Sequence, residues 1–445
     1  MSEPLIISRG RALELCEQAL AACPADQAEV HVGAQRGALT RFADNHIHQN
    51  VAEQDTGLSV RAVVDRRIGM ASGNDLSEAG VADTARRAAE LARLSEPVED
   101  FESLPEPRPI EREARGVAAT AQFGPHERAE AVRAMIAIAR EAGQTASGAF
   151  SVWVGGSAVA NSLGVRAFDE STGAHLRTVM MAEDSSGFAQ TLSRDVTDID
   201  AEALARTAVH KTEASRHPVE VPPGQYDVVL EPAAVSDLVG YAAIISFGAL
   251  ACEEGRSAIC GRIGERICGE NINLWDDGMD PRGRMTSFDY EGMPRQPVAL
   301  IDGGIAAGLV YDTRTARREG RSSTGHATGS SSMGPVPTNL FLGAGDATTD
   351  EMVSSTERGL LVTRFHYTNI VNPKQTVLTG MTRDGTFLIE DGRLVSGVRN
   401  LRFTQSVLEA LGRVEMVGAE GAYMGMVWAP ALKIRDFTFT GTTEF

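Results

Sequence analysis

The hydrophobic positions in the first half of the chain follow one order twice. In the first unit, Arg9–Cys23 carries apolar residues at helical spacing and Ser77–Leu94 is an alanine-rich helical stretch. Between them the apolar positions alternate with a period of two, which predicts strands. The predicted strands are Ala28–Val32, Leu39–Phe42, Ile47–Val51, Gly57–Val64 and Arg67–Ser72. The pattern therefore predicts a helix, an antiparallel meander and a closing helix.

The same order returns after Glu96–Pro109, a linker rich in proline and glutamate. The second unit opens with a predicted helix at Glu127–Ala142 and closes with one at Ala201–Arg216. Its predicted strands are Ala149–Val154, Ser157–Ala160, Val165–Glu170, His175–Ala182 and Ser186–Ser193. The two units share little sequence identity, so the predicted duplication rests on the order of the elements.

The second half of the chain has a different pattern. A strand at Tyr226–Leu230 precedes Pro232, which favours a helix start, and the apolar helix Ala233–Cys252. Short strand-like runs and glycine-rich turns follow. Asp391-Gly392 predicts a tight hairpin, because both of its positions favour positive φ, and Asp302-Gly303-Gly304 predicts another turn between strands.

These patterns predict an α+β fold. We expect a duplicated helix–antiparallel meander–helix N-terminal half and a β-rich C-terminal domain with a few helices. The expected units are residues 1–95, residues 110–220, a central domain, and residues 221–445.

Charge and cysteine usage narrow the classes of function. The 445 residues include 42 Lys and Arg against 60 Asp and Glu, a net charge of −18, which repels nucleic acid and anionic lipid. We therefore expect no direct nucleic-acid partner and no membrane partner. The five cysteines are an odd number, typical of reduced thiols in a cytoplasm. Met1-Ser2-Glu3-Pro4 begins no apolar signal core, so a cytoplasmic location is expected.

Common catalytic signatures are missing from the sequence. There is no G-x-x-x-x-G-K-[ST] phosphate loop, and Gly343-Ala344-Gly345-Asp346 lacks the third glycine of a dinucleotide fingerprint. The nucleophile elbow G-x-S-x-G is also absent. No catalytic residue can be assigned on this basis.

Three groups of residues invite a metal-site interpretation, and a structural one is favoured for each. Cys252, Cys260 and Cys268 recur every eighth residue, which suits one helix face better than zinc chelation. His46-Ile47-His48 places two imidazoles on one strand face, most simply a solvent-facing one. The run 276–280, Asp-Asp-Gly-Met-Asp, departs from the EF-hand order and is interpreted as an acidic loop.

Two regions supply candidate substrate-binding residues. The loop 321–337 is rich in Gly, Ser and Thr and begins with basic, hydroxyl and imidazole groups, although it could equally be a mobile hydrophilic loop. Polar groups beside predicted strands form the second region, where they could line a cleft or satisfy turns and strand edges. The six candidates are Arg321, Thr324, His326, His366, Asn369 and Arg383.

An ordered series of motifs in the second half resembles the TldD/PmbA family. The series starts with Phe288-Asp289-Tyr290-Glu291-Gly292-Met293-Pro294, Asp302-Gly303-Gly304 and Ser323-Thr324-Gly325. It continues through Asn369, Thr382-Arg383-Asp384-Gly385, Glu390-Asp391-Gly392 and Arg399-Asn400-Leu401-Arg402-Phe403-Thr404. The family was named for modulation of DNA gyrase and is associated with metallopeptidase activity. The resemblance covers essentially the whole chain.

The resemblance also implies a zinc site that this sequence does not match. Catalytic members carry H-E-x-x-x-H on the helix after the strand that opens the C-terminal domain, with a late Cys as third ligand. The corresponding stretch, Ala233–Cys252, contains no His, has Asp237 as its one acid, and no Cys follows Cys268. The chain therefore resembles the PmbA (TldE) branch. For this branch the resemblance implies no metal and no cofactor in the chain itself, and zinc in a partner subunit.

The expected function follows from this resemblance. It implies a zinc-less PmbA/TldE-like subunit of a metallopeptidase system, acting in proteolysis or peptide-precursor processing on a peptide substrate. The implied partner is a zinc-bearing TldD-like subunit, with a homodimer as a further possibility. One alternative is a stand-alone metal-independent hydrolase that uses His326 with Arg383 or His366. The other is a binding protein that regulates gyrase or another macromolecule.

Overall fold

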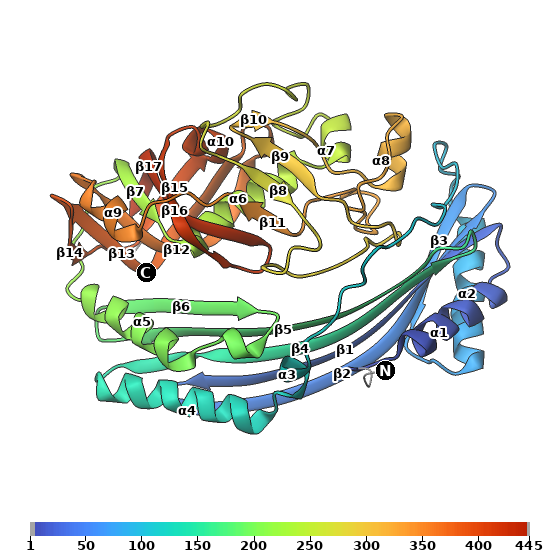
Figure 1. Ribbon diagram of the computed structural model, residues 1–445, viewed down its shortest axis with the longest axis horizontal. Coiled ribbons are helices and arrows are strands. Elements are labelled where there is room, and N and C mark those ends of the chain that lie inside the picture. Colours follow the sequence, from blue (N-terminus) through green and yellow to red (C-terminus); the bar gives the residue numbers. More distant parts are fainter. Residues whose placement is uncertain (1–4, 443–445) are drawn as a thin grey trace.

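The computed structural model describes residues 5–442 and shows an α+β fold built on two sheets. The Met1–Pro4 segment discussed above lies outside the described residues, as do residues 443–445. One six-stranded sheet belongs to the N-terminal half, and an eleven-stranded sheet belongs to the C-terminal domain. Figure 1 shows the C-terminal domain lying along one side of the first sheet. The predicted fold class is confirmed.

The first sheet confirms the predicted duplication. The first unit consists of α1 (Arg9–Ala22), β1 (Gln27–Ala43), β2 (His46–Val64), β3 (Arg67–Gly73) and α2 (Glu78–Leu94). The second consists of α3 (Ala118–Gln122), α4 (Pro125–Glu141), β4 (Thr145–Asn161), β5 (Arg166–Met181), β6 (Ser186–Ser193), η1 (Val196–Asp198) and α5 (Ala201–Ala214). The strand order β3-β2-β1-β4-β5-β6 joins the two antiparallel meanders through β1 and β4.

The strands of this sheet are fewer and longer than predicted. Ala28–Val32 and Leu39–Phe42 belong to one strand, β1, because Gly33 pairs with Gly57 and Gly37 pairs with Glu53 without a break. The glycines and polar residues interrupt the hydrophobic alternation but leave the backbone ladder intact. The same continuity merges the other predicted runs into β2, β4 and β5. His46 and His48 lie exposed on β2, which confirms a solvent-facing strand.

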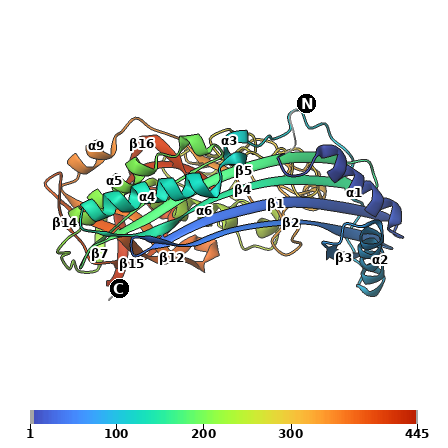
Figure 2. The same ribbon diagram turned by 90° about the horizontal axis from the view of Figure 1, so that it is seen from below.

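Helices α1, α2, α4 and α5 pack on one face of the first sheet (Figure 2). Helices α1 and α2 pack at one end, where Leu15 and Ala88 contact a core that includes Val30 and Val60. Helices α4 and α5 pack at the other end over a second core. Burial of these apolar side chains supplies the main free energy that holds the helices to the sheet.

The C-terminal domain opens with β7 (Gly224–Leu230), α6 (Pro232–Ser246) and α7 (Ala249–Glu253). Pro232 starts α6 as predicted, but the predicted helix Ala233–Cys252 is two helices. The break occurs because the N–H of Ala249 donates to the carbonyl of Val310 rather than continuing α6. A side chain at Gly248 would also lie 2.2 Å from the carbonyl oxygen of Pro335.

The remaining elements form most of the second sheet. They are β8 (Leu274–Asp276), β9 (Val298–Asp302), β10 (Ile305–Ala306), α8 (Thr313–Arg318), β11 (Leu340–Leu342), α9 (Thr349–Ser354), β12 (Arg358–Asn372), η2 (Pro373–Gln375), β13 (Val377–Glu390), β14 (Arg393–Gly397), β15 (Leu401–Ser406), α10 (Val407–Leu411), β16 (Val414–Tyr423) and β17 (Val427–Thr442). Both predicted hairpins are confirmed. Asp391 and Gly392 have φ of 48° and 73°, and Gly303 and Gly304 have φ of 52° and 79°.

The central part of this sheet positions α6. Strand β7 pairs in parallel with β12 and antiparallel with β17, and α6 packs on β12 and β17. Within residues 5–442, none of the helices combines the length and the apolarity that crossing a membrane requires.

Candidate functional site at the β12 bulge

Strand β12 carries a bulge where it passes α6. Its pairing with β13 shifts register between His366 and Asn369. Within this bulge Tyr367 has a φ of 51°, a region of backbone conformation that bulky residues rarely adopt, and its side chain is 71% exposed. Bulges redirect side chains and recur next to active sites, and strained backbone clusters at functional sites. The bulge therefore marks a candidate site, which we call the β12 bulge site.

Helix α6 supplies a carboxyl group to this site. The hydroxyl of Thr368, just beyond Tyr367, donates to Oδ2 of Asp237 at 3.3 Å. Burial raises the pKa of Asp237 to about 6, although this hydrogen bond and the charge of Arg364 oppose the shift. Asp237 therefore changes its protonation state close to neutral pH.

An ion pair ties the site to the first sheet. Nε of Arg364, on β12, donates to Oδ2 of Asp384 on β13 at 3.1 Å, and its guanidinium lies 4.1 Å from the ring centre of Phe188 on β6. The hydroxyl of Ser186, also on β6, donates to Oδ1 of Asp384 at 2.8 Å. Because β6 is the edge strand of the first sheet, the position of the N-terminal half is coupled to the β12 bulge site.

Two of the predicted residues contribute polar side chains here. His366 lies beside Tyr367, with ring centres 4.4 Å apart. Burial, together with the charges of Arg383 and Arg364, lowers the pKa of His366, so its imidazole is neutral at pH 7. The amide of Asn369 donates to the carbonyl of Tyr367 at 3.0 Å, within the bulge itself. The site thus offers guanidinium, imidazole and carboxyl groups suited to hydrogen-bonding a polar chain.

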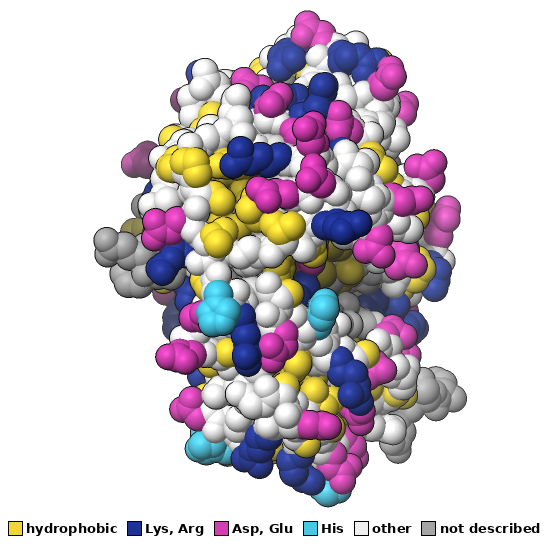
Figure 3. All heavy atoms as spheres, turned by 90° about the vertical axis from the view of Figure 1, so that its left-hand side faces the viewer, with side chains coloured by type: hydrophobic (Ala, Val, Ile, Leu, Met, Phe, Trp, Pro, Cys, Tyr) yellow, Lys and Arg dark blue, Asp and Glu magenta, His cyan; other side chains and the backbone are white. Residues whose placement is uncertain are grey.

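A cavity of about 360 Å³ adjoins this site between the two sheets. It is lined by β6, α5 and the start of α6, including Phe188, Lys211 and Glu231, and also by Thr363 of β12 and by Met424, which follows β16. Lys211 and Glu231 form an ion pair at 2.5 Å along its wall. Figure 3 shows the molecule from the left-hand side of Figure 1. Hydrophobic side chains gather on the C-terminal domain in the upper half of this view, and a hollow lies below them.

The residues present do not fit a zinc site. Zinc is held by imidazole, thiolate and carboxylate ligands, usually four in tetrahedral arrangement. Helix α6 has no His or Cys, and its part-exposed side carries Asp237 and Tyr241. Across residues 5–442 no group of three or more His, Cys, Asp and Glu side chains lies close enough together to hold a metal ion.

The other predicted residues lie elsewhere. His326 is 1% exposed, so the interpretation as a mobile hydrophilic loop is wrong at this residue. Its Nε2 lies 3.0 Å from Oδ1 of Asp276, and its Nδ1 lies 2.9 Å from the hydroxyl of Thr324. Asp276 is fully buried at the end of β8, which also corrects its assignment to an acidic loop. Arg321 is exposed and its guanidinium lies 5.6 Å from the ring centre of Tyr311.

The six candidates therefore divide between two places. His366, Asn369 and Arg383 meet on β12 and β13, whereas Arg321, Thr324 and His326 follow α8, toward the other end of the C-terminal domain (Figure 1). Sequence reasoning does not find Thr368, Arg364 and Asp384 as site residues. Asp384 stands in the Thr382–Gly385 motif, but no pattern pairs it with Arg364 across two strands.

The three late cysteines do not share a helix face. Cys252 lies in α7, but Cys260 and Cys268 lie in the irregular chain that follows. The thiol of Cys260 is exposed and donates to the carbonyl of Cys252 at 3.1 Å. Their spacing fits helical turns, but the helical prediction is wrong because Gly255, with φ of 63°, ends the helix after Cys252.

Three sequence models of known protein domains match this chain. A sequence model described as PmbA/TldA metallopeptidase domain 1 matches residues 28–92, the central domain matches residues 120–216, and the C-terminal domain matches residues 223–441. The chain belongs to the PmbA/TldD family. The family is described as metallopeptidase-like, and residues 223–441 of this chain, which match its C-terminal domain, contain the β12 bulge site.

Relatives within the PmbA/TldD family are distant. An uncharacterized protein of Methanocaldococcus jannaschii is 30% identical over 199 residues, 44% of this chain and 47% of that protein. A TldD homologue of Haemophilus influenzae, named a metalloprotease, is 29% identical over 270 residues, 55% of this chain and 54% of the relative. The chain thus spans about half the length of these curated relatives. Metalloprotease PmbA of Escherichia coli O157:H7 is 22% identical over 437 residues, 93% of each chain.

Solved structures share the fold. TldE from Thermococcus kodakarensis superposes with a TM-score of 0.87 at 23% identity, covering 98% of this chain and 100% of that one. A structure described as a possible modulator of DNA gyrase from Thermotoga maritima also gives a TM-score of 0.87, at 19% identity, covering 96% and 100%.

Proposed function

We propose that this chain is a zinc-less, PmbA/TldE-like subunit that acts with a zinc-bearing TldD-like subunit in peptide hydrolysis or peptide-precursor processing. The observation that carries the proposal is the composition of α6. The helix follows β7 directly, where catalytic members are expected to carry their zinc-binding histidines, and here Asp237 and Tyr241 occupy its part-exposed side. A carboxyl and a phenol without imidazole partners cannot replace a zinc site.

The surface around the bulge supports a partner-binding role. Four large apolar side chains are exposed on α6 and on the end of β12, two elements that contact each other: Tyr241, Tyr367, Ile370 and Val371. Exposed apolar patches of this kind mark interaction sites, and aromatic residues are enriched in protein interfaces. We infer that this patch, here called the α6–β12 patch, faces the zinc-bearing subunit.

The polar groups of the site support a role in holding peptide. Arg383 and the neutral His366 lie beside the α6–β12 patch, and both can hydrogen-bond peptide carbonyls or a carboxylate. His326 is buried and has a hydrogen-bonding partner within reach of each ring nitrogen, which argues against the alternative of a stand-alone hydrolase built on this residue. The net charge of −18 argues against direct DNA binding.

Co-purification tests the proposal. The chain is co-expressed with a tagged TldD-like subunit from the same source, and we expect the two to elute together from affinity and size-exclusion columns. The double variant Tyr241→Glu/Tyr367→Glu should elute separately while keeping its circular dichroism spectrum, because two charges would be buried in the interface. Leu94→Glu is the control, since Leu94 is 84% exposed on α2 in the N-terminal half.

Three outcomes would contradict the proposed association or the interface assigned to it. The first is elution of the unaltered chain as a free species in the presence of the TldD-like subunit. The second is undiminished co-elution of the double variant, which would exclude the α6–β12 patch from the interface. The third is equal loss of association by Leu94→Glu, which would show a nonspecific effect of added charge.

A further inference from the structure

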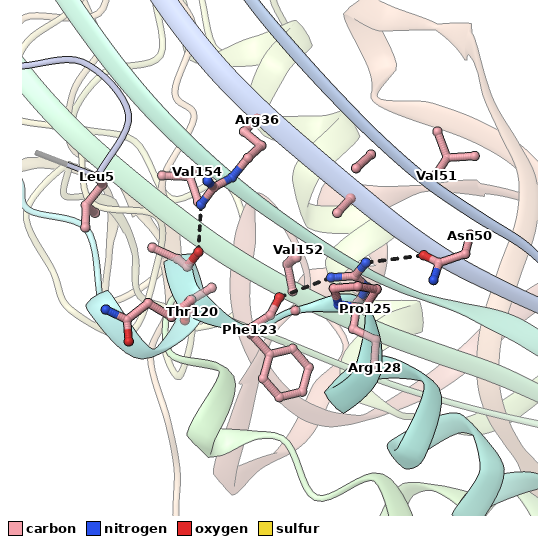
Figure 4. A pocket seen from close by; sticks show the side chains of 15 residues that line it. Leu5, Arg36, Asn50, Val51, Thr120, Phe123, Pro125, Arg128, Val152 and Val154 are labelled. Atoms are coloured by element: carbon pink, nitrogen blue, oxygen red, sulfur yellow. Dashed lines mark hydrogen bonds between the residues drawn. The ribbon is translucent and has the colours of Figure 1, made fainter.

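A second cavity, separate from the β12 bulge site, lies on the helix-covered side of the first sheet. It has a volume of about 780 Å³ and is bounded by β1, β2, β4, α3 and the start of α4 (Figure 4). Most of its wall is apolar, with Val51 and Ala52 from β2, Phe123 before α4, and Val152 and Val154 from β4. This size matches the cavities that bind small organic ligands, which are mostly apolar with a few placed polar groups.

Arg128 brings a buried positive charge to this cavity. Its side chain is 2% exposed and donates from Nε to the hydroxyl of Thr40 at 3.1 Å, from Nη1 to the carbonyl of Phe123 at 3.1 Å, and from Nη2 to Oδ1 of Asn50 at 3.3 Å. All three acceptors are neutral. A guanidinium has five N–H groups, so two remain beyond these bonds. Burial lowers the pKa of Arg128, as expected for a charge removed from water.

Arg36 adds a second guanidinium to the same cavity. It lies on β1 and donates from Nη2 to the carbonyl of Ala121 at 2.7 Å. Within residues 5–442, neither Arg36 nor Arg128 has a carboxylate within ion-pair distance. The charge of Glu127 acts on Arg128, but the Glu127 carboxylate accepts its hydrogen bond from the N–H of Gly124 at 3.1 Å.

Two guanidiniums that have no carboxylate partner within the described part of the chain lie in a mostly apolar wall, and together they indicate the chemistry of the ligand. A buried charge is costly unless an opposite charge compensates it. The planar guanidinium matches the geometry of a carboxylate, and the apolar wall would remain unfilled by a small inorganic anion. We propose that this cavity binds a carboxylate carried on an apolar body, such as a fatty acid or the free C-terminus of an apolar peptide. The site is independent of the function proposed above, because its residues belong to the first sheet and its helices.

Isothermal titration calorimetry of the full chain tests this site with decanoate as the probe. We expect one decanoate per chain, and no binding of decan-1-ol, which has the same tail without the charge. Arg36→Gln should weaken decanoate binding at least about tenfold, the loss expected for one charged hydrogen bond. Ala52→Trp, which fills the cavity from β2, should abolish binding.

Controls separate the site from indirect effects. Arg41→Gln removes an exposed arginine whose side chain lies on the opposite face of β1, and should bind decanoate like the unaltered chain. Arg128→Met is used only if its circular dichroism spectrum is native, because the substitution removes three hydrogen bonds of a buried side chain. A native Arg128→Met chain should lose decanoate binding, since the variant keeps an apolar side chain at this place but removes the charge.

The source of the carboxylate is distinguished by a second pair of probes. Acetyl-Phe-Leu with a free C-terminus and its amide differ only in the terminal charge. Binding of the free acid but not the amide supports the proposal with a peptide C-terminus as ligand, and binding of decanoate alone supports it with a fatty acid. Absence of binding by both carboxylates, equal binding of decan-1-ol, or affinity unchanged in both Arg36→Gln and Ala52→Trp would overturn it.

Discussion

Asp169 on β5 accepts two hydrogen bonds from Ser287 of the C-terminal domain, one from its N–H at 2.7 Å and one from its hydroxyl at 2.6 Å. The N–H of Ala114, in the segment between the two N-terminal units, donates to the same carboxyl group at 2.7 Å. Asp169 is buried. The Asp169 side chain therefore joins the first sheet, the linker and the C-terminal domain. This junction is separate from the contact that β6 makes with Asp384.

Removing this junction should destabilise the whole chain. Asp169→Ala leaves three buried donors without an acceptor, and we expect the free energy of unfolding to fall by about 3 kcal/mol. Urea denaturation followed by circular dichroism measures the change. Glu53→Ala, at an exposed position on β2, serves as the control and should stay within about 0.5 kcal/mol of the unaltered chain. Equal stability of the two variants would contradict the assigned role of Asp169.

The buried pair of Asp276 and His326 should be a stability element rather than a catalytic one. Asp276 also accepts from the N–H groups of Thr338 and Asn339 at 2.7 and 2.8 Å. In Asp276→Asn, the side-chain NH₂ would face a hydrogen-bond donor where the carboxylate now accepts. We therefore expect the free energy of unfolding to fall by about 3 kcal/mol. Asp302→Asn, at an exposed position of β9, should change it little. A fully stable Asp276→Asn chain would show that the pair is dispensable.

The raised pKa of Asp237 predicts how stability depends on pH. Its pKa is about 6 in the folded chain against an ordinary value of 3.8, so the folded state binds the proton more tightly than the unfolded state. The resulting stabilisation is full below about pH 4 and is lost as pH rises through about 6. A tenfold difference in proton affinity corresponds to about 1.4 kcal/mol, and partial exposure reduces the expected total to about 2 kcal/mol.

Urea denaturation of the unaltered chain and of Asp237→Asn at pH 4.5 and pH 7.5 measures this effect. The amide does not titrate, so Asp237→Asn should gain stability relative to the unaltered chain as the pH rises. Asp302→Asn should show no such pH-dependent difference. A stability difference between Asp237→Asn and the unaltered chain that is constant across this pH range would mean that the pKa of Asp237 is ordinary.

The positive φ of Tyr367 should lower the stability of the fold, whereas its exposed ring should strengthen association with the TldD-like subunit. Tyr367→Gly removes the cost of a positive φ at a side chain that is largely exposed, and should raise the free energy of unfolding by about 1 kcal/mol. The same variant should weaken association with the TldD-like subunit, because it deletes part of the α6–β12 patch. Tyr226→Gly is the matched control and should be destabilised, since Tyr226 packs against Phe439. A destabilised Tyr367→Gly chain would show that its ring contributes packing rather than strain.

Local patterns are enough to predict the repeated helices, both hairpins and the solvent-facing histidines of β2. These features depend on neighbours in sequence, such as the positive φ shared by Asp391 and Gly392. The continuity of β1 cannot be predicted in this way. Its backbone pairing with β2 continues through Gly33 and Gly37, where the alternation of apolar side chains is interrupted. The composition of α6 can be read directly, since the absence of histidine is a property of sequence.

The candidate site depends more strongly on long-range contacts. The pairing of Asp276 with His326 spans 50 residues, and the contact of Thr368 with Asp237 spans 131. No periodicity reports such partners, so His326 resembles a loop residue in the sequence although it is buried. His366 and Arg383 can be proposed because polar residues within apolar strands stand out, but Arg364 and Asp384 need the register of β12 with β13.

The central claim is that hydrolysis depends on a metal held by another polypeptide. Zinc content, measured by plasma mass spectrometry on the purified chain alone and on its complex with a TldD-like subunit, tests it most directly. We expect negligible zinc in the isolated chain after dialysis, and one zinc per pair of subunits together with chelator-sensitive peptide cleavage in the complex. One tightly held zinc per isolated chain, accompanied by chelator-sensitive peptide cleavage, would contradict the account.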